Sequence, residues 1–479
     1  MIRSAHRTKQ AKIIATLGPV SSGVQKIIQL ADAGAGVFRL NFSHGTYDEH
    51  AARIQAVRLA EEELGYPLGL FMDLQGPKFR LGAFQKGKAF LKIGQPFVFD
   101  LDANRPGDDE RVCMPHPEIL EAVRVGDRLL IDDGKMIMSV SEVTTEYMVA
   151  IAQVEGVISD RKGISLPDNE IKVSALTEKD KRDLVFGLER GIASVALSFV
   201  QRPEDIQELR HLAGRRIQLI SKIEKPTALN YLDEIIAQSD AVMVARGDLG
   251  VEMPPEKVPA IQKKIVAAAR NQGCPVIVAT QMLESMINTP TATRAEASDV
   301  ATAIYDGVDA VMLSAETAAG DYPVETVSFM ARVISEVEND ALYRSLMDAS
   351  RNGATNTATD AISAAARQVA STIEAKVIIC YSTSGKTALR AARERPEAPI
   401  IVLTADTDVA RALSLVWSAY AIVCPDAADM KAMVQSALEV VQEKQVVEDG
   451  DSVVITAGVP FGNAGTTNVL RIAKVGVDA

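Results

Sequence analysis

Short apolar runs alternate with longer segments of mixed apolar and polar residues over most of the chain. The short runs have the length of buried strands, and the longer segments carry apolar residues at helical spacing. Counting from Lys12, this rhythm predicts eight strands, each followed by a helix. The predicted strands are KIIATLG (12–18), VFRLNFSHG (37–45), LGLFMDL (68–74), SVALSFV (194–200), IQLISKIE (217–224), AVMVARGD (241–248), PVIVATQM (275–282) and AVMLSAET (310–317).

Helical patterns fill the segments between these strands. Ser21 or Ser22 is expected to cap the first helix, and Thr177 with Asp180 forms a capping signature for a later one. Eight strand–helix units favour a closed (β/α)8 barrel, with a doubly wound open sheet as the alternative. Further helices are predicted at 47–64, 177–189, 203–212, 229–239, 258–271 and 294–305.

The pattern changes twice along the chain. From 78 to 168, short alternating runs separated by turn residues predict a small β domain inserted into the barrel, with one short helix at 117–123. After about 340, a polar stretch at 345–360 is predicted to be a linker to a separate open α/β domain. Its predicted helices are 361–373 and 388–395, and its predicted strands are 375–382, 399–405 and 451–458.

The expected architecture is therefore an α/β chain of three parts. A TIM-type (β/α)8 barrel carries an inserted small β-barrel domain and is followed by the C-terminal open α/β domain. The expected limits are 1–77 and 169–340 for the barrel, 78–168 for the inserted domain and 341–479 for the C-terminal domain.

Composition narrows the class of protein. The chain has 479 residues, is 47% hydrophobic and 24% charged, and has a net charge of -12. These values fit a soluble globular protein and argue against nucleic acid as the main partner. We expect no membrane contact and a cytoplasmic location, because no stretch has the apolar length of a membrane helix or the apolar core of a signal peptide. The four cysteines lie far apart in apolar contexts and are expected to be reduced core thiols.

Polar residues gather at the ends of the predicted strands. The most prominent stretch is AVMVARGDLGVE at 241–252, in which a charged pair interrupted by glycine follows a buried run. The carboxyl ends of the strands form the active face of a (β/α)8 barrel, so these residues are expected to converge there. They are Arg39, Asn41, Ser43, Asp73, Lys222, Glu224, Arg246, Asp248, Thr280, Ser314 and Glu316.

This set of residues suits a phosphorylated anion. Glu224 and Asp248 end neighbouring strands and could hold one Mg²⁺, leaving positions for substrate oxygens and water. Lys222 and Arg39 add positive charge, which is the electrostatic clamp that phosphoryl transfer needs. Arg246 suits a phosphate or carboxylate, or else a structural ion pair.

Backbone and hydroxyl groups add to this picture. The N–H groups of Gly247 and Asp248 open a turn and could receive a carboxylate. Thr280 offers a neutral hydroxyl that suits a proton relay.

A second candidate site lies in the C-terminal domain. A strand-to-helix loop there is rich in hydroxyls and backbone donors, which makes it a natural phosphate site, with a plain capping turn as the alternative. It is not a Walker A motif, because the first glycine is missing. The loop consists of Ser382, Thr383, Ser384, Gly385, Lys386 and Thr387.

The sequence motifs resemble those of the pyruvate kinase family along nearly the whole chain. They are KIIATLGP, FRLNFSHG, DLQGPKFRLG, ISKIE, VARGDLGVE, ATQMLESM, the long segment PTATRAEASDVATAIYDGVDAVMLSAETAAGDYPVE, and the final GTTN. The resemblance implies transfer of a phosphoryl group from phosphoenolpyruvate to ADP, giving pyruvate and ATP in glycolysis. It also implies a homotetramer with a phosphorylated allosteric effector bound in the C-terminal domain.

The resemblance also implies roles for single residues. Glu224 and Asp248 would be ligands of Mg²⁺ or Mn²⁺, Lys222 would stabilise the transferring phosphoryl group and the enolate, and Arg39 would bind the phosphoryl group. Gly247, Asp248 and Thr280 would hold phosphoenolpyruvate, and Thr280 would belong to the route that protonates the enolate. The positions on the nucleotide side are Asn41, Phe42, Ser43, His44, Arg80 and Lys162. Because Lys162 lies in the inserted domain, that domain is expected to close over the nucleotide as a lid.

A monovalent cation is a further feature of the family. The matching ligand positions are Asn41, Ser43, Asp73 and the carbonyl of Leu74. Relatives that depend on K⁺ tend to carry Glu just after the Gly–Pro pair, whereas here Lys78 follows it. A tethered ammonium would repel K⁺ and take its place, so the resemblance predicts an enzyme that is active without K⁺. The alternative is that Lys78 points into solvent at the domain hinge.

Two other functions are compatible with parts of this pattern. A metal-dependent aldolase acting on phosphoenolpyruvate or pyruvate would share Glu224, Asp248 and an arginine, but would need neither Lys162 nor an effector domain. A catalytically inactive sugar-phosphate sensor would need a broken site, and every catalytic position here is filled. The effector itself is expected to be a monophosphorylated sugar or nucleotide, because the last loop, GVPFGNAG, has no basic residue for a second phosphate.

Overall fold

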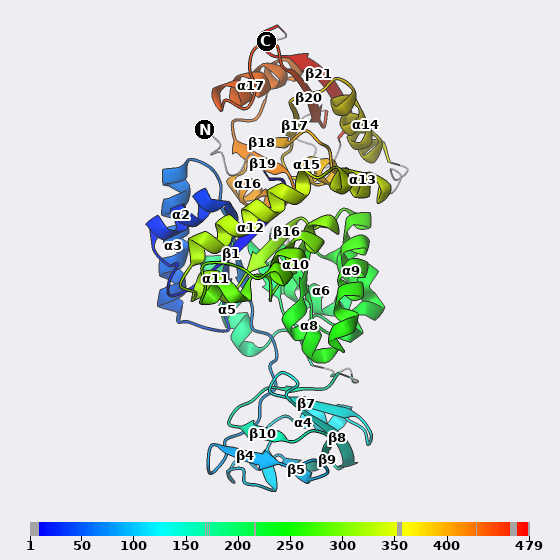
Figure 1. The fold of residues 1–479 in the computed structure, drawn as a ribbon. Helices are drawn as coiled ribbons and strands as arrows, with labels where there is room; N and C mark the ends of the chain where they lie inside the picture. Colours follow the sequence, from blue (N-terminus) through cyan, green and yellow to red (C-terminus); the bar gives the residue numbers. More distant parts are fainter. Residues whose placement is uncertain are drawn as a thin grey trace.

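The computed structural model describes residues 9–167, 169, 171, 173–214, 217–351, 357–427, 429–459 and 467–477. A barrel of strands and helices occupies the middle of the molecule (Figure 1). The inserted β domain lies at one end of the barrel, joined to it by two chain crossings, and the C-terminal α/β domain lies at the opposite end.

Eight parallel strands form a closed barrel, which confirms the (β/α)8 prediction and excludes the open sheet. The neighbours around the barrel are β1, β16, β15, β14, β13, β12, β3 and β2. Their bounds are Lys12–Leu17 (β1), Ala35–Asn41 (β2), Gly69–Asp73 (β3), Ser194–Leu197 (β12), Gln218–Ile223 (β13), Ala241–Ala245 (β14), Val276–Ala279 (β15) and Ala310–Leu313 (β16).

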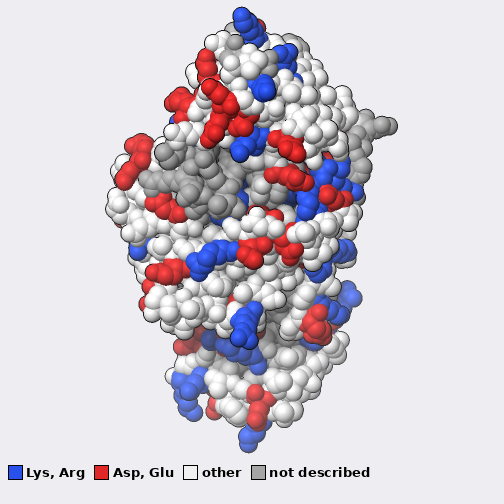
Figure 2. All heavy atoms as spheres, turned by 45° about the horizontal axis from the view of Figure 1, so that its top comes forward, with Lys and Arg blue, Asp and Glu red and all other residues white. Residues whose placement is uncertain are grey.

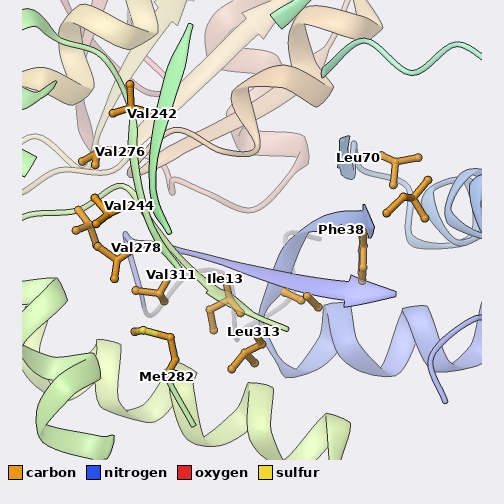
Figure 3. Packing of buried hydrophobic residues seen from close by; sticks show 14 of the residues in the cluster. Ile13, Phe38, Leu70, Val242, Val244, Val276, Val278, Met282, Val311 and Leu313 are labelled. Atoms are coloured by element: carbon orange, nitrogen blue, oxygen red, sulfur yellow. The ribbon is translucent and has the colours of Figure 1, made fainter. Parts of the chain in front are cut away.

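Along each barrel strand, successive side chains point alternately into the barrel interior and toward the surrounding helices. Ile14 of β1 lies in the cluster that fills the barrel interior, whereas its neighbours Ile13 and Ala15 pack against the surrounding helices. Figure 3 shows the outer layer, in which Val278, Val311 and other strand residues meet the helices. Because both faces are buried, the strands are continuous apolar runs rather than alternating ones.

The helices of the barrel agree closely with the predicted segments. Thr177 caps α5 in a capping box with Asp180, as predicted. The predicted cap at Ser21 or Ser22 is wrong: Gly23 is the N-cap residue without a side-chain bond, because both serine hydroxyls bond to the backbone of Gly18 instead. The helices are Val24–Ala33 (α2), Tyr47–Leu64 (α3), Glu178–Glu189 (α5), Pro203–Ala213 (α6), Leu232–Gln238 (α7), Arg246–Glu252 (α8), Val258–Gln272 (α9), Arg294–Tyr305 (α10), Ala315–Ala318 (α11) and Pro323–Glu338 (α12).

The inserted domain is the expected small β unit. A six-stranded sheet in the order β11, β7, β8, β9, β5, β6 and a two-stranded sheet of β10 and β4 share one apolar core. Its elements are Lys88–Leu91 (β4), Pro96–Asp100 (β5), Arg111–Cys113 (β6), Pro117–Ala122 (α4), Arg128–Ile131 (β7), Met136–Val143 (β8), Tyr147–Ala152 (β9), Gly156–Ser159 (β10) and Ile164–Ser165 (β11).

The C-terminal domain is an open five-stranded sheet in the order β19, β18, β17, β20, β21, in which only the edge strand β21 runs antiparallel. Part of the predicted linker is wrong, because residues up to Ala349 continue a helix capped by Asp340, with Tyr343 and Met347 buried on one face. The elements are Ala341–Ala349 (α13), Ala358–Thr372 (α14), Val377–Tyr381 (β17), Lys386–Arg393 (α15), Ile400–Thr404 (β18), Thr407–Leu413 (α16), Ala419–Val423 (β19), Met430–Glu443 (α17), Ser452–Ala457 (β20) and Val469–Lys474 (β21).

The C-terminal domain packs against the amino ends of the barrel strands. Ser418 N–H donates to the Gln10 carbonyl at 2.8 Å, and Lys12 Nζ donates to the Ala419 carbonyl at 2.7 Å. The inserted domain leaves the barrel after β3, at the carboxyl ends of the strands. The predicted active face is therefore directed toward the inserted domain.

Two expectations from composition can be compared with the described part of the chain. All four cysteines are buried and free, as predicted. Within the described residues, no helix is long and apolar enough to cross a membrane. On the face shown in Figure 2, acidic and basic side chains lie intermixed.

Candidate active site

The strand β2 is shorter than predicted, and this changes the position of Ser43. Arg39 and Asn41 lie in the strand, but Ser43 lies in the turn that follows. The side-chain oxygen of Asn41 accepts a hydrogen bond from Ser43 N–H at 3.1 Å, a local turn that competes with continuation of the strand. Ser43 and His44 are exposed, whereas the side chain of Phe42 is buried.

A buried chain of charges joins β2, β3 and β13. Arg39 Nε donates to Asp73 Oδ2 at 2.7 Å, and the other oxygen of Asp73 lies 3.2 Å from Lys222 Nζ. Thr16 at the end of β1 accepts a further bond from Arg39 at 3.2 Å. Burial alone would raise the pKa of Asp73, but the charges of Lys222 and Arg39 outweigh it and lower the pKa. Asp73 therefore stays ionised and holds both cations at the carboxyl ends of the strands.

Lys222 is held between two carboxylates. Its Nζ lies 2.8 Å from Glu224 Oε1 and donates to Ser198 Oγ at 2.7 Å. Burial would lower the pKa of Lys222, but Asp73 and Glu224 outweigh it, so its pKa is raised and the ammonium stays charged. The predicted placement of Lys222 and Glu224 on one face of a strand agrees with this contact.

Glu224 is 1% exposed, and its Oε2 accepts a bond from Phe199 N–H at 2.7 Å. Burial raises the pKa of Glu224 to about 7, against the opposing charge of Lys222, and the charge of Asp248 adds to the rise. The two carboxylates are thus close enough to repel each other, an arrangement that a divalent cation would relieve.

The donor set at this position fits Mg²⁺. Glu224 Oε1 is buried and makes no hydrogen bond of good geometry with the described residues, so it keeps a lone pair for a cation. Within the described residues, no group of three or more His, Cys, Asp or Glu side chains could hold a metal by itself. Two carboxylates that leave positions to substrate and water are typical of Mg²⁺ sites in phosphoryl transfer.

Arg246 forms a structural ion pair, the second of its two predicted roles. Its terminal nitrogens donate to both oxygens of Asp299 at 2.7 Å, and one of them also donates to the Thr280 carbonyl at 2.8 Å. The side chain is buried beneath the first turn of α8. Arg246 therefore ties the turn that carries Asp248 to Asp299, and it also contributes to the lining of a cleft beside Gly247 and Asp248.

Thr280 lies directly beside the start of α8. Its Oγ1 accepts the Gly247 N–H at 2.7 Å and donates to the Ala279 carbonyl at 2.6 Å, and its backbone is left-handed, with φ of 71°. One of the two N–H groups predicted to receive a carboxylate is thus bonded to Thr280 in this structure. The arrangement brings Gly247, Asp248 and Thr280 together.

Three of the residues predicted for the nucleotide side and the monovalent site bond to other residues of the chain. Arg80 donates to the Arg161 carbonyl at 3.0 Å, and Lys162 Nζ lies 2.8 Å from Asp132 Oδ1 in the inserted domain. The carbonyl of Leu74 accepts a bond from Ser198 Oγ at 2.7 Å.

A cleft separates the barrel from the inserted domain. Lys78 is exposed and contributes to its lining at the point where the chain enters the inserted domain. The charged residues that line the cleft are Lys78, Asp133, Lys225, Asp248 and Glu252. Lys78 thus faces the cleft that contains a predicted metal ligand.

In the C-terminal domain, the predicted phosphate loop precedes α15. Gly385 is the N-cap residue with φ of 77°, and the helix begins at Lys386, earlier than predicted. Thr383, Ser384 and Lys386 are exposed, whereas Ser382 and Thr387 are buried. The Thr387 hydroxyl bonds to that of Thr467 at 2.9 Å, and most of the glycine-rich segment before Thr467 lies outside the described residues.

Three residues of the site are not among those predicted from the sequence. Thr16, Ser198 and Phe199 hold Arg39, Lys222 and Glu224 respectively. Thr16 and Ser198 are polar residues that follow apolar runs near strand ends, which is the signal that could have found them. Phe199 acts through its backbone N–H, with φ of 56°, and a side-chain pattern cannot reveal that.

A closed (β/α)8 barrel with buried cations and carboxylates at the carboxyl ends of its strands defines an enzyme that binds a phosphorylated anion. Residues 8–327 match the barrel domain of pyruvate kinase, and residues 360–473 match the pyruvate kinase alpha/beta domain. The chain therefore belongs to the pyruvate kinase family.

Individual relatives resemble the chain over nearly its whole length. A pyruvate kinase of Methylorubrum extorquens is 51% identical over 469 residues, covering 98% of both chains. One from Agrobacterium vitis is 46% identical, covering 98% of this chain and 99% of its own. The crystal structure of a pyruvate kinase from Cryptosporidium parvum superposes with a TM-score of 0.93 at 33% identity, covering 98% of this chain and 97% of that one.

Proposed function

We propose that the chain catalyses transfer of the phosphoryl group from phosphoenolpyruvate to ADP, giving pyruvate and ATP in glycolysis. The observation that carries this proposal is the placement of Lys222, which lies between Asp73 and Glu224 with Arg39 beside them. This geometry places two cationic side chains where a transferring phosphoryl group would develop negative charge.

The proposed roles follow from these positions. Arg39 binds the phosphoryl group, and Lys222 stabilises both its transfer and the enolate that remains. Gly247, Asp248 and Thr280 hold the carboxylate end of phosphoenolpyruvate, and the Thr280 hydroxyl belongs to the route by which the enolate gains its proton. Asp73 acts on both cations by holding their side chains in place.

Glu224 and Asp248 would hold Mg²⁺ or Mn²⁺. A bound divalent cation would neutralise charge on the substrate oxygens. The buried Glu224 Oε1, which makes no hydrogen bond of good geometry beside its 2.8 Å ion pair with Lys222, supports this assignment.

The nucleotide side is assigned to Asn41, Ser43, His44, Arg80 and Lys162, together with the backbone of Phe42. We propose that the inserted domain, residues 78–168, closes over the barrel parts 1–77 and 169–340 and excludes water from the cleft. Asp132 and the Arg161 carbonyl, which engage Lys162 and Arg80, would then be exchanged for nucleotide phosphates.

We further propose that Lys78 replaces K⁺ at the monovalent site formed by Asn41, Ser43, Asp73 and the Leu74 carbonyl. The observation that bears on this role is that Lys78 lines the cleft that also contains Asp248.

The C-terminal domain, residues 341–479, is proposed to bind a monophosphorylated effector at the 382–387 loop and to take part in a homotetramer. The exposed Thr383, Ser384 and Lys386 at a helix start support the phosphate site. A cytoplasmic location is also proposed, which the four free buried thiols support.

The testing experiment is a lactate dehydrogenase-coupled assay with phosphoenolpyruvate, ADP and Mg²⁺. The proposal expects pyruvate formation that requires ADP. Absence of ADP-dependent pyruvate together with aldol cleavage would favour a metal-dependent aldolase, and absence of both activities would favour a sensor.

A further inference from the structure

The loop of residues 42–44, between β2 and α3, is tied down by side chains from two helices. Lys179 Nζ of α5 donates to the Phe42 carbonyl at 2.7 Å. His50 Nε2 of α3 lies 2.9 Å from the His44 carbonyl, which can only accept, so the imidazole donates. The two bonded carbonyls stand on either side of Ser43.

Lys179 is itself held in one direction. Its Nζ lies 2.6 Å from Asp183 Oδ2, and the other oxygen of Asp183 accepts a bond from Tyr47 Oη at 2.8 Å. Asp183 is only 1% exposed, and the Tyr47 ring stacks on Phe186 at 4.4 Å between centroids. A long lysine side chain that would otherwise sample many rotamers is therefore confined toward the loop.

His50 is buried against the same loop. Its ring is 2% exposed and stacks on the Phe42 ring at 4.1 Å, with 9° between the planes. Burial lowers the pKa of His50, which favours the neutral ring that donates from Nε2. The stacked pair fixes the inward side of the loop, while Ser43 and His44 stay exposed.

We propose that Lys179 and His50 are positioning residues for the nucleotide, because they fix the 42–43 and 44–45 peptide planes on either side of the Ser43–His44 pair and so present Ser43 and His44 to the phosphates. The proposal rests on the nucleotide-side role of Asn41, Ser43 and His44 proposed above. Neither residue touches the reacting atoms, so each acts through the loop.

The first test compares Lys179→Met with Lys181→Met. Both lysines are on α5, but Lys181 pairs only with the surface carboxylates Glu178 and Glu208 in the described structure and serves as the matched control. Losing a bond from a charged donor is expected to raise KM for ADP by about fivefold to tenfold in Lys179→Met. KM for phosphoenolpyruvate should change by less than about twofold, and Lys181→Met should match the unaltered chain.

The second test separates the hydrogen bond of His50 from its ring stacking. His50→Phe keeps a stacking ring but has no donor, so KM for ADP should rise as in Lys179→Met. His50→Gln keeps an N–H that can reach the His44 carbonyl and should restore a KM within about twofold of the unaltered chain.

A readout that does not depend on activity completes the design. Hydrogen–deuterium exchange in the peptide that covers residues 41–46 should be faster in Lys179→Met and unchanged in Lys181→Met. Unaltered KM for ADP in folded Lys179→Met and His50→Phe, measured in an active parent enzyme, would overturn the inference. Failure of the parent chain to form pyruvate would instead overturn the proposed function, and the exchange result would still report on the loop.

Discussion

At the scale of single residues, the site is organised by largely buried cations that are paired with carboxylates. Lys222 and Arg39 share Asp73, and Lys222 also faces Glu224. Burial makes each of these charges costly unless its partner is present. The same confinement holds the cations in place before substrate arrives, which is the condition for electrostatic stabilisation of a transition state.

Most of these residues could be predicted from the sequence. Polar side chains at the ends of apolar runs are expected to be buried, and burying a polar group costs free energy unless it has a bonding partner. The prediction was wrong where a local bond decides the backbone. Ser43 was placed on a strand, but the Asn41 side chain bonds to its N–H and ends the strand first. Arg246 could not be assigned, since only the fold shows that Asp299 lies opposite it.

The monovalent ion gives a prediction at this scale. If the Lys78 ammonium takes the place of K⁺, replacing K⁺ by tetramethylammonium at constant ionic strength should leave kcat/KM nearly unchanged. Activation by K⁺ of more than about tenfold, roughly 1.4 kcal/mol, would show that the site still needs the ion and that Lys78 is not its substitute.

At the scale of elements, the short connections that follow the strands, rather than the strands themselves, determine where the side chains of the site lie. The helix α8 starts directly after β14, and Arg246 joins it to α10 through Asp299. Element types were predictable from apolar periodicity, because strands that are buried on both faces and amphipathic helices differ clearly. The helix α13 was missed because only Tyr343 and Met347 mark its buried face within a polar stretch.

Breaking the Arg246 ion pair should destabilise the turn at α8. Asp299→Asn removes a charged acceptor from a buried guanidinium, so the free energy of unfolding should fall by about 1.5–3 kcal/mol. Urea unfolding measures this change. Glu178→Gln removes a surface pair with Lys181 and should cost less than about 1 kcal/mol. Equal effects in the two variants would contradict the structural role assigned to Arg246.

The 382–387 loop gives a second prediction for an element. Calorimetry should show binding of a sugar monophosphate that is weakened about fivefold or more in Lys386→Ala, because a charge at the helix start is removed. Tight binding of a bisphosphorylated sugar, or an unchanged response in Lys386→Ala, would count against the monophosphate assignment.

At the scale of the whole molecule, the barrel lies between two other domains of the chain. The inserted domain faces the carboxyl ends of the strands, and the C-terminal domain is bonded to their amino ends (Figure 1). Asp309 lies just before β16. It accepts hydrogen bonds from the Arg395 guanidinium and from the backbone N–H of Trp417, both at 3.2 Å. Strand order and domain insertion were predictable, but pairing across this junction was not, because its residues lie far apart in the sequence.

The junction should contribute strongly to stability. Arg395 and Asp309 are 2% and 4% exposed, so Arg395→Met would leave a buried carboxylate without its cation. We expect a loss of about 3–5 kcal/mol in urea unfolding. Arg411→Met breaks the more exposed pair with Glu61 across the same junction and should cost clearly less. A larger loss in Arg411→Met would show that the buried pair is not the main contact.

Transfer of a phosphoryl group from phosphoenolpyruvate to ADP, with Lys222 stabilising the transfer, can be followed directly by phosphorus NMR, which detects both reactant and product. Phosphoenolpyruvate should disappear as the γ-phosphate of ATP appears. Lys222→Met should slow this conversion by about 10²–10³-fold while circular dichroism shows an intact fold. Release of inorganic phosphate in place of ATP would rule out the proposed reaction, and near-normal conversion by folded Lys222→Met would rule out the role of Lys222.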